Sequence, residues 1–418
     1  MGDIVRVDDM LMALIPLFDE NMAVCAYSIF SQKNNYLLNP MLLGTGQNDG
    51  AMRVTGLEMI QKVGLETMSG GKEIFVPVNN MAVFADIESQ CDAPRSKIVL
   101  LFDNTIPPVE MYLNRLKELK ERGYKLAVRK LAVSEFEAHR PILQLMDYVF
   151  INSRKVALDK AKIYFEKLYP DAKLCAGNLE SVEVFENVRA QGGYDLFEGN
   201  FYRMPVTKGQ NEVAPIKVIY IDLLNIVNNK NFELTQAADI IGRDTALTIS
   251  LLKIVNRIAI NSEITSIRHA AAMLGQRELK KWINTAVVNE LYADKPSEIT
   301  RVSLLRAKFA EHLAVAFGLA MNADELFLMG IFSVLDVILD KSMAEALEIV
   351  QVSKKISDAL IHGQGELAPV LDFIKQYEAA NWPEVSRQMV LKDIHMNVIN
   401  DAYQESLCWY QKITSGTK

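Results

Sequence analysis

Apolar and polar residues follow two different patterns along this chain. Up to about residue 205, short apolar runs alternate with stretches in which apolar residues recur every three or four positions. The apolar runs are expected to be strands at residues 22–30, 73–79, 97–103, 124–130, 147–152, 172–178 and 194–202. Several are continuously apolar, which is typical of strands that a parallel sheet buries on both faces. This alternation predicts an α/β fold for residues 1–205, with a TIM-like (β/α) barrel as the leading form.

After residue 205 the pattern becomes helical. Residues 206–215 are polar and interrupted by Gly and Pro, as in a linker or outer loop. One strand-like run follows at residues 216–227, and helical spacing then dominates, as at residues 234–259 and 302–320. We therefore predict that residues 206–418 form a mostly α-helical second domain, C-terminal helices included.

Length and charge narrow the class of protein. A chain of 418 residues is long enough for two domains. It has no apolar run of the ~18–20 residues that span a membrane, and its acidic start is unlike a signal peptide, so a cytoplasmic protein is expected. The net charge of −7 argues against a nucleic-acid partner. A local basic run, residues 275–284, is interpreted as the solvated face of a helix.

Cysteine and histidine are scattered rather than clustered. No CxxC pair, zinc-type spacing or HExxH motif occurs, so the thiols are expected to be free and no metal or cofactor is predicted from these residues. The residues concerned are Cys25, Cys91, Cys175, Cys408, His139, His269, His312, His362 and His395.

The helical half contains segments in a recognisable order. The segments IGRDTALTISLLKIVN, ITSI and AAAMLGQRELKKWI follow one another within residues 241–283. In this order they resemble the HDOD domain, a helical relative of the HD phosphohydrolases. Where an HD enzyme has adjacent metal-binding His and Asp, this chain has Ser333 and Val334. The resemblance therefore implies a helical platform for a protein partner, and Asp336 is expected only to cap or hydrogen-bond within the bundle.

The first half resembles the EAL domain, a barrel that in active members hydrolyses cyclic di-GMP with two metal ions. The resemblance rests on the order of AVCAYSIF, GYKLAV, DYVFIN, AGNLES and GYDLFEGNFYRMP. Matched to the family motifs, Glu180 is retained. The other positions expected to carry metal ligands, a lysine or a glutamine hold Ser28, Pro77, Leu101, Arg129, Lys130, Phe150, Asn152 and Glu198. Asn79 and Asp103 lie close to two of these positions.

These replacements predict that the EAL-like site has lost its metals. Two cations in place of two carboxylates repel a divalent ion by several kcal/mol (roughly, at an effective dielectric near 20). The resemblance then implies no catalytic residue, no cofactor and no enzyme, but a signalling scaffold that acts through protein partners. Two alternatives stay open: a sensor that binds a nucleotide or another anion weakly at the barrel mouth, and a residual phosphodiesterase.

Arg129 and Lys130 lie at the C-terminal end of the strand predicted at residues 124–130, where a barrel usually places its chemistry. One interpretation is a phosphate contact, since Arg and Lys are the usual phosphate donors. The favoured one is that one cation pairs with Asp103, Glu135 or Glu180 while the other is solvated. The sequence leaves open the identity of any partner and whether the chain forms a homo-oligomer.

Overall fold

A computed structural model of the chain describes residues 10–32, 53–203, 215–229, 232–258, 264, 266–291, 297–350 and 352–415. The chain divides into two compact units. The first comprises residues 1–204 and 373–411, and the second comprises residues 205–372 and 412–418. The first division lies next to the predicted one at residue 205. Residues 373–411, which were predicted to belong to the second domain, cluster with the first unit instead.

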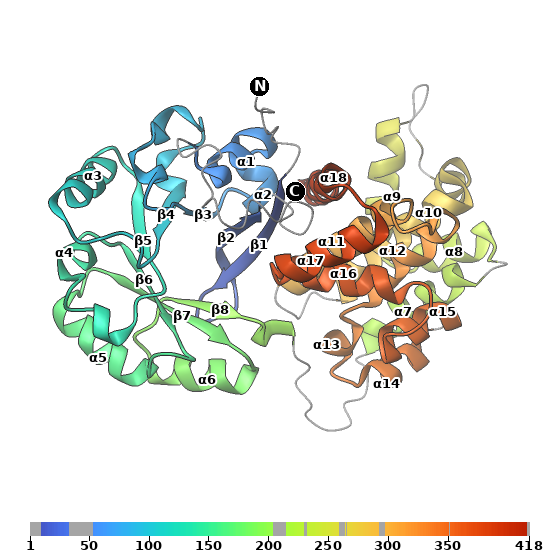
Figure 1. Ribbon diagram of the computed structural model, residues 1–418. Coiled ribbons are helices and arrows are strands. Elements are labelled where there is room, and N and C mark those ends of the chain that lie inside the picture. The colour runs from blue at the N-terminus through green and yellow to red at the C-terminus, as the bar shows by residue number, and fades with distance from the viewer. Residues whose placement is uncertain are drawn as a thin grey trace, which may run out of the picture. The chain divides into compact units, whose positions relative to one another are not determined.

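The first unit contains a closed barrel with the strands in sequential order (Figure 1). The strands are β1 (Leu11–Phe18), β2 (Val24–Gln32), β3 (Glu73–Pro77), β4 (Ile98–Phe102), β5 (Lys125–Val128), β6 (Tyr148–Asn152), β7 (Lys173–Leu179) and β8 (Leu196–Gly199). β1 runs antiparallel to β2 and β8, and the other neighbours are parallel. Each of the seven predicted strands is present. β1 was not predicted, because Pro16 weakens the strand signal of its apolar run.

Helices follow most strands and cover the outside of the barrel (Figure 1). They are α1 (Thr55–Val63), α2 (Leu65–Ser69), α3 (Glu110–Glu121), α4 (Arg140–Leu143), α5 (Leu158–Leu168) and α6 (Val182–Gln191). Helix α3 buries Leu116 and Leu119 and ends before Gly123, whose φ is +93°. Only a residue that tolerates positive φ can make this turn without strain.

The barrel interior is filled with side chains. The inward-facing cluster consists of Leu17, Ala26, Phe75, Val99, Leu101, Ala127, Tyr148, Phe150, Cys175 and Leu196. Phe75 packs edge-on against both Tyr148 and Phe150, with ring centroids 5.0 and 5.4 Å apart. The interior is therefore a packed core, and a ligand has room only at the ends of the strands.

The last part of the chain completes the barrel unit. It comprises the end of α16 (Ala368–Glu378), α17 (Trp382–Lys392) and α18 (Met396–Ser415) as far as residue 411. Tyr377 is fully buried, and its hydroxyl accepts a hydrogen bond from the Met12 N–H at 3.2 Å. The Gln32 amide donates to Ser386 Oγ at 3.0 Å, and Thr67 Oγ1 donates to Gln411 Oε1 at 2.7 Å. These contacts tie β1, β2 and α2 to residues more than 340 positions later.

The second unit is helical throughout its described part. Its helices are α7 (Pro215–Asn228), α8 (Leu234–Ile241), α9 (Thr245–Ile258), α10 (Ile267–Leu291), α11 (Ser297–Leu313), α12 (Ala323–Phe332), α13 (Leu335–Leu339), α14 (Met343–Ile349), α15 (Lys354–Ser357) and the start of α16. None of the described helices is both long and apolar enough to cross a membrane. The linker predicted at residues 206–215 lies outside the described residues, apart from Pro215.

One predicted element of the second unit is wrong. Residues 216–227 were predicted to be a strand, but they form helix α7. Tyr220, Leu223, Leu224 and Val227 are buried at helical spacing on one side of it. The β-branched residues of this run favour a strand locally, and packing against α8 and α10 outweighs that preference.

Candidate functional site

A cavity of about 500 Å³ opens at the carboxyl ends of β7 and β8, within the barrel unit. Its polar lining consists of Arg154, Asn178, Glu180, Glu198, Asn200, Tyr202, Arg203 and Glu378, and Ile15, Pro16 and Phe30 are part of its apolar wall. This is the end of a (β/α) barrel at which ligands are bound, because the loops that follow the strands converge there. Its volume lies in the range of small-molecule sites.

An irregularity between β7 and β8 shapes this cavity. The register of the two strands shifts between Ala176 and Leu179, and Asn178 has a φ of +61°. A Cβ at Gly199 would lie 2.0 Å from the carbonyl oxygen of Leu179, so only glycine fits there. This close approach of two backbones brings the side chains of Asn178 and Glu198 to the same opening.

Arg129 lies over an aromatic ring at the edge of the cavity. Its guanidinium carbon is 4.8 Å from the centre of the Phe30 ring. Burial lowers the pKa of Arg129, and the nearby carboxylates of Glu198 and Asp103 act in the opposite direction. Burial likewise raises the pKa of Glu198, with Arg129 acting against it. Arg129 and Glu198 therefore lie close enough to influence each other's charge, although they were predicted only as separate replaced positions.

Lys130 has a different environment from its neighbour. Its Nζ lies 3.1 Å from Asp103 Oδ2, and its φ is +65°. Asp103 also accepts hydrogen bonds from the Thr105 hydroxyl at 2.6 Å and N–H at 3.1 Å. Burial acts to raise the pKa of Asp103, but these hydrogen bonds and Lys130 outweigh it and lower the pKa. The predicted pairing of one cation with Asp103 is thus present, whereas the predicted solvation of Arg129 is wrong.

Two further arginines line the cavity, and each is paired with a glutamate. Arg154 Nε donates to Glu180 Oε1 at 2.7 Å, and both side chains are largely exposed. Arg203 Nη1 lies 2.8 Å from Glu378 Oε2, and Arg203 Nε donates to the Tyr202 hydroxyl at 2.7 Å. Asn152 accepts a hydrogen bond from the Arg154 N–H at 3.0 Å and so shapes the loop after β6.

Sequence reasoning missed both arginines and Glu378. Arg203 lies inside the segment GYDLFEGNFYRMP and Arg154 directly follows DYVFINS, so both were within reach of the motifs already considered. Glu378 lies about 175 residues from Arg203 in the chain, and no local pattern connects them. Only the return of α16 to the barrel unit places it at the cavity.

Four other predicted positions lie on strands below or beside the mouth. Leu101 and Phe150 belong to the packed interior, and Pro77 ends β3. Ser28 is fully buried, and its hydroxyl has no hydrogen-bond partner among the described residues. Asn79, the alternative to Pro77, caps the following turn by accepting hydrogen bonds from the N–H groups of residues 81 and 82.

The predicted HD-like positions take part in helix packing. Ser333 ends α12, and its hydroxyl donates to the Gly330 carbonyl at 2.7 Å and accepts from Arg306 Nη1 at 3.1 Å. Val334 is buried between α12 and α13. These two residues therefore separate α12 from α13.

Neither the barrel mouth nor the HD-like position holds a set of metal ligands among the described residues. Among the residues that the structure describes, no three His, Cys, Asp or Glu side chains lie together so that they could hold an ion. All four cysteines are free.

The chain is similar to known proteins over most of its length. Residues 213–361 match the HDOD domain. The cyclic di-GMP phosphodiesterase CdgJ of Vibrio cholerae is 28% identical over 77% of this chain and 74% of its own. The uncharacterized protein YuxH of Bacillus subtilis is 26% identical over 94% of this chain and 96% of its own. The structure of the EAL enzyme Bd1971, bound to cAMP and cyclic di-GMP, matches this chain with a TM-score of 0.35 and 12% identity. The match covers 46% of this chain and only 60% of that structure.

The predicted architecture, a closed (β/α) barrel followed by a helical unit that matches the HDOD domain, is confirmed. The prediction that the chain is not an enzyme is wrong, because a relative that matches three quarters of it is named a phosphodiesterase. That prediction compared single positions with linear motifs. The barrel mouth also receives the Glu378 carboxylate, which pairs with Arg203 and comes from outside those motifs, so a motif comparison does not describe the site.

Proposed function

We propose that this chain acts in cyclic di-GMP signalling and that the cavity at the barrel mouth binds the cyclic dinucleotide. The observation that carries the proposal is the convergence of arginine and aromatic side chains on one cavity of about 500 Å³. The name of the Vibrio cholerae relative as a cyclic di-GMP phosphodiesterase supports this choice of ligand.

The side chains suit the two chemical parts of such a ligand. Arginine binds phosphate oxygens with two parallel N–H donors, and Arg154 and Arg203 line the cavity. The exposed pair between Arg154 and Glu180 is weak, so a phosphate can replace Glu180 at low cost. The half-buried ring of Phe30 offers a flat surface on which a guanine base can stack.

Calorimetric titration of the full chain with cyclic di-GMP tests the proposal. We expect saturable binding, which Arg154→Met weakens about tenfold because it removes a charged hydrogen bond. Arg53→Met is the matched control, since Arg53 is as exposed as Arg154 (67% each), lies in the same unit and pairs with Glu58 away from the cavity. Chromatography of the same samples with Mg²⁺ or Mn²⁺ shows whether bound ligand is converted to the linear dinucleotide.

Absence of binding at about 100 µM ligand would overturn the proposal, because a dissociation constant of that size corresponds to a binding free energy of only ~5–6 kcal/mol. Equal binding by the two variants would place the ligand elsewhere on the chain. Binding without linear product identifies a receptor, and binding with product identifies an enzyme like its named relative.

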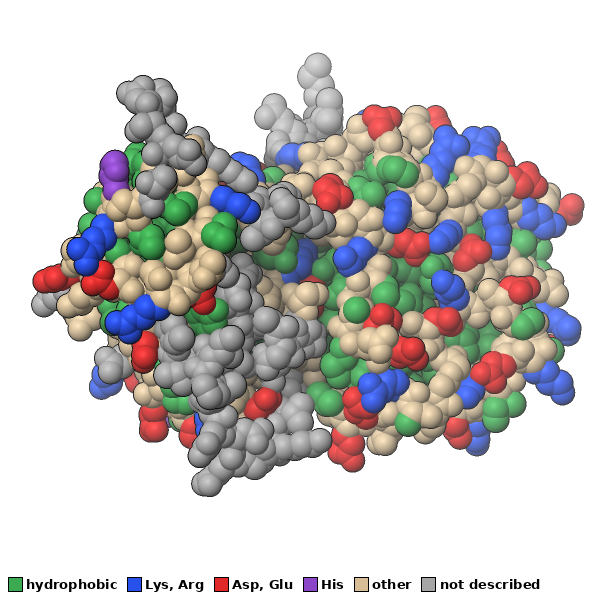
Figure 2. All heavy atoms as spheres, turned by 180° about the vertical axis from the view of Figure 1, so that it is seen from behind, with side chains coloured by type: hydrophobic (Ala, Val, Ile, Leu, Met, Phe, Trp, Pro, Cys, Tyr) green, Lys and Arg blue, Asp and Glu red, His purple; other side chains and the backbone are tan. Residues whose placement is uncertain are grey.

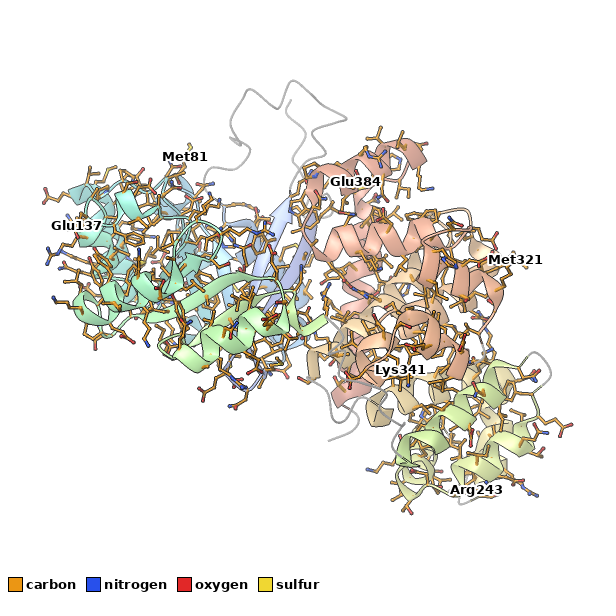
Figure 3. The ribbon with its side chains drawn as sticks, turned by 90° about the horizontal axis from the view of Figure 1, so that it is seen from below. Met81, Glu137, Arg243, Met321, Lys341 and Glu384 are labelled. Carbon is orange, nitrogen blue, oxygen red and sulfur yellow. The ribbon has the colours of Figure 1, made fainter. Side chains whose placement is uncertain are left out.

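A protein partner is a second candidate, supported by one surface of the barrel unit. Met81, Phe84, Val109 and Met111 are exposed there, and the Phe84 and Tyr112 rings are 4.8 Å apart. Figure 3 shows Met81 on the outside of this unit. Exposed apolar groups that gather in one place are typical of interaction sites. Met81→Ser with Met111→Ser should abolish capture of such a partner and leave cyclic di-GMP binding unchanged, whereas unchanged capture would contradict this role.

A further inference from the structure

The HDOD unit contains a pocket of about 300 Å³ that none of the predicted sites includes. It lies along α10, which is not one regular helix. Gly275 has a φ of 74° and a ψ of 170°, so the helix is broken there and a new helical segment begins at Gln276. The first residues of that segment, Gln276 and Arg277, line the pocket. The positive end of a helix segment of 16 residues thus faces it, which favours an anion.

Asn284 is the second, independent feature of this pocket. Its side chain is only 1% exposed, and it lines the cavity. Its Nδ2 donates to the Lys280 carbonyl at 2.9 Å, but its Oδ1 has no hydrogen-bond partner among the described residues. A buried acceptor without a donor costs stability, so it is normally retained for a reason. Here the free acceptor is available to an N–H group of a ligand.

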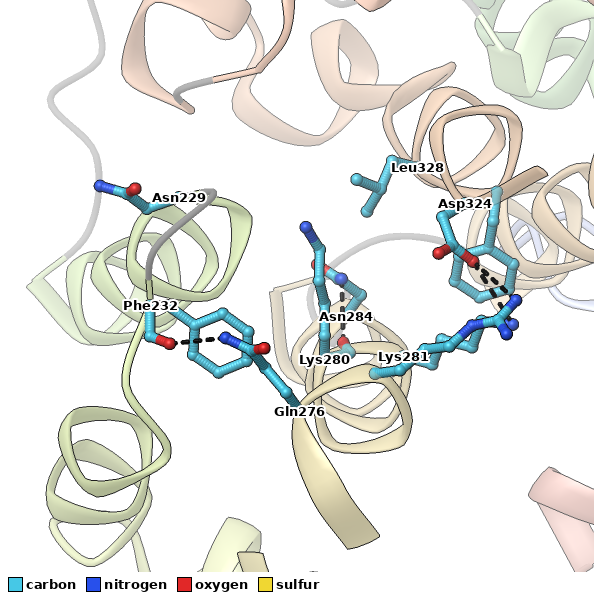
Figure 4. Close-up of a pocket in the computed structure, with 10 residues that line it drawn as sticks. Asn229, Phe232, Gln276, Lys280, Lys281, Asn284, Asp324 and Leu328 are labelled. Atoms are coloured by element: carbon cyan, nitrogen blue, oxygen red, sulfur yellow. Dashed lines mark hydrogen bonds and ion pairs between the residues drawn. The ribbon is translucent and has the colours of Figure 1, made fainter. Parts of the chain in front are cut away.

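Lys280 supplies a cation that the surrounding chain does not pair. Figure 4 shows it beside Asn284, between Phe232 and Gln276 on one side and Leu328 and Asp324 on the other. Its ammonium has no ion pair or hydrogen bond to another described residue, and burial lowers its pKa against the effect of Asp324 and Glu325. Lys281 and Arg277 are occupied, because both lie near Asp324 (3.7 and 3.5 Å) and Lys281 also pairs with Glu311.

The remaining walls are apolar and partly aromatic. Phe232, Phe327 and Leu328 are buried and line the cavity. Gln276 is held in place, because its Nε2 donates to the Phe232 carbonyl at 2.7 Å. A flat apolar body with one negative group at one end and N–H donors at its edge therefore matches the pocket. The basic run that sequence reasoning interpreted as a solvated helix face is in part the lining of this cavity.

We propose that this pocket binds a purine nucleoside monophosphate. Lys280 and the start of the helical segment at Gln276 contact the phosphate, Asn284 Oδ1 accepts a hydrogen bond from the base edge, and the phenylalanine rings pack against the purine. This site is separate from the barrel mouth and does not depend on what binds there.

Leucine-methyl NMR of the full chain tests the proposal with adenosine and guanosine 5′-monophosphate. We expect at least one nucleotide to shift the Leu328 methyl signals saturably, while guanosine and adenosine without phosphate bind about tenfold more weakly or less. Leu196, in the barrel interior, reports separately on binding at the other unit. Lys280→Met keeps the aliphatic stem and removes the charge, so it should weaken nucleotide binding about tenfold.

Lys253→Met is the matched control, because Lys253 is exposed on α9 of the same unit and does not line the pocket. Asn284→Leu is a second variant that removes the free acceptor and should also weaken binding. The proposal is overturned if neither nucleotide moves the Leu328 signals, if Lys280→Met binds as tightly as the native chain, or if inorganic phosphate binds as tightly as the nucleotides.

Discussion

At the scale of single residues, burial and nearby charges act in opposite directions on the pKa values of the groups at the barrel mouth. Glu198 is half-buried at the end of β8, and its pKa is raised by burial even though Arg129 acts to lower it. Arg129 is held over Phe30 rather than in solvent. The net effect is that the fold favours the protonated form of Glu198, so ionisation of this one carboxyl opposes folding.

Replacing this carboxyl should change how stability depends on pH. A carboxyl whose pKa is higher in the folded than in the unfolded state contributes stability below its ordinary pKa, about 4.3 for Glu, and loses it as pH rises through the folded value. Glu198→Gln cannot ionise. We therefore expect the unfolding temperature of the variant to exceed that of the native chain by an amount that grows from pH 4 to pH 8. Each kcal/mol of stability difference should shift this temperature by about 2–4 °C. A difference that is the same at both pH values would contradict this.

At the scale of elements, close backbone contacts decide where side chains point. β7 and β8 approach so closely at Gly199 that no Cβ fits, and the shifted register there turns Asn178 and Glu198 toward the cavity. α11 and α12 meet in the same manner, since a Cβ at Gly330 would lie 2.3 Å from Ala307 Cα. Surface charges contribute less to this arrangement, because exposed ion pairs add little stability. Figure 2 shows Lys, Arg, Asp and Glu interspersed over the outer face of the barrel unit.

The strand contact gives a matched pair of glycine variants. Gly199→Ala forces a Cβ to within 2.0 Å of the Leu179 carbonyl oxygen and should lower the free energy of unfolding by about 1–3 kcal/mol. Gly177→Ala on β7 meets nothing nearer than the Ile151 carbonyl oxygen at 3.5 Å and should change it by less than about 1 kcal/mol. Denaturant titration of both variants measures the difference, and equal losses would show that the contact does not constrain this part of the barrel.

At the scale of the whole molecule, the chain returns to its first unit after completing most of the second. α17 and most of α18 belong with the barrel, and Glu384 on α17 can be followed in Figure 3. Tyr377 lies in the core of the barrel unit, 365 residues from its hydrogen-bond partner Met12. A boundary at residue 205 therefore does not separate two self-sufficient domains.

A fragment of residues 1–205 should be much less stable than the barrel unit of the full chain. It would leave uncovered the surfaces of β1 and β2 that Tyr377 and Ser386 contact. Circular dichroism during heating measures the stability of the fragment. In the full chain, Tyr377→Ala should lower the free energy of unfolding by about 3–5 kcal/mol. Phe84→Ala, an aromatic truncation at an exposed position of the same unit, is the control. A fragment that melts like the full chain would show that the returning helices are dispensable.

The sequence by itself determined the class of fold. Strands buried on both faces must be continuously apolar, and helices that cover them must be amphipathic, so local periodicity alone indicated a barrel followed by a helical domain. It also located Arg129 and Lys130 at the end of a strand. β1 and α7 were the exceptions, because Pro16 and a run of β-branched residues carried misleading local signals.

Only the tertiary structure decided which of these side chains share a site. Glu378 joins Arg203, Arg129 lies over Phe30, and Asn284 keeps a free acceptor beside Lys280. Each of these facts depends on groups that lie far apart in the chain or on the absence of a partner in a packed interior. Local periodicity indicates which face of an element is buried, but not which distant element buries it. The chemistry at both cavities depends on which distant elements meet there.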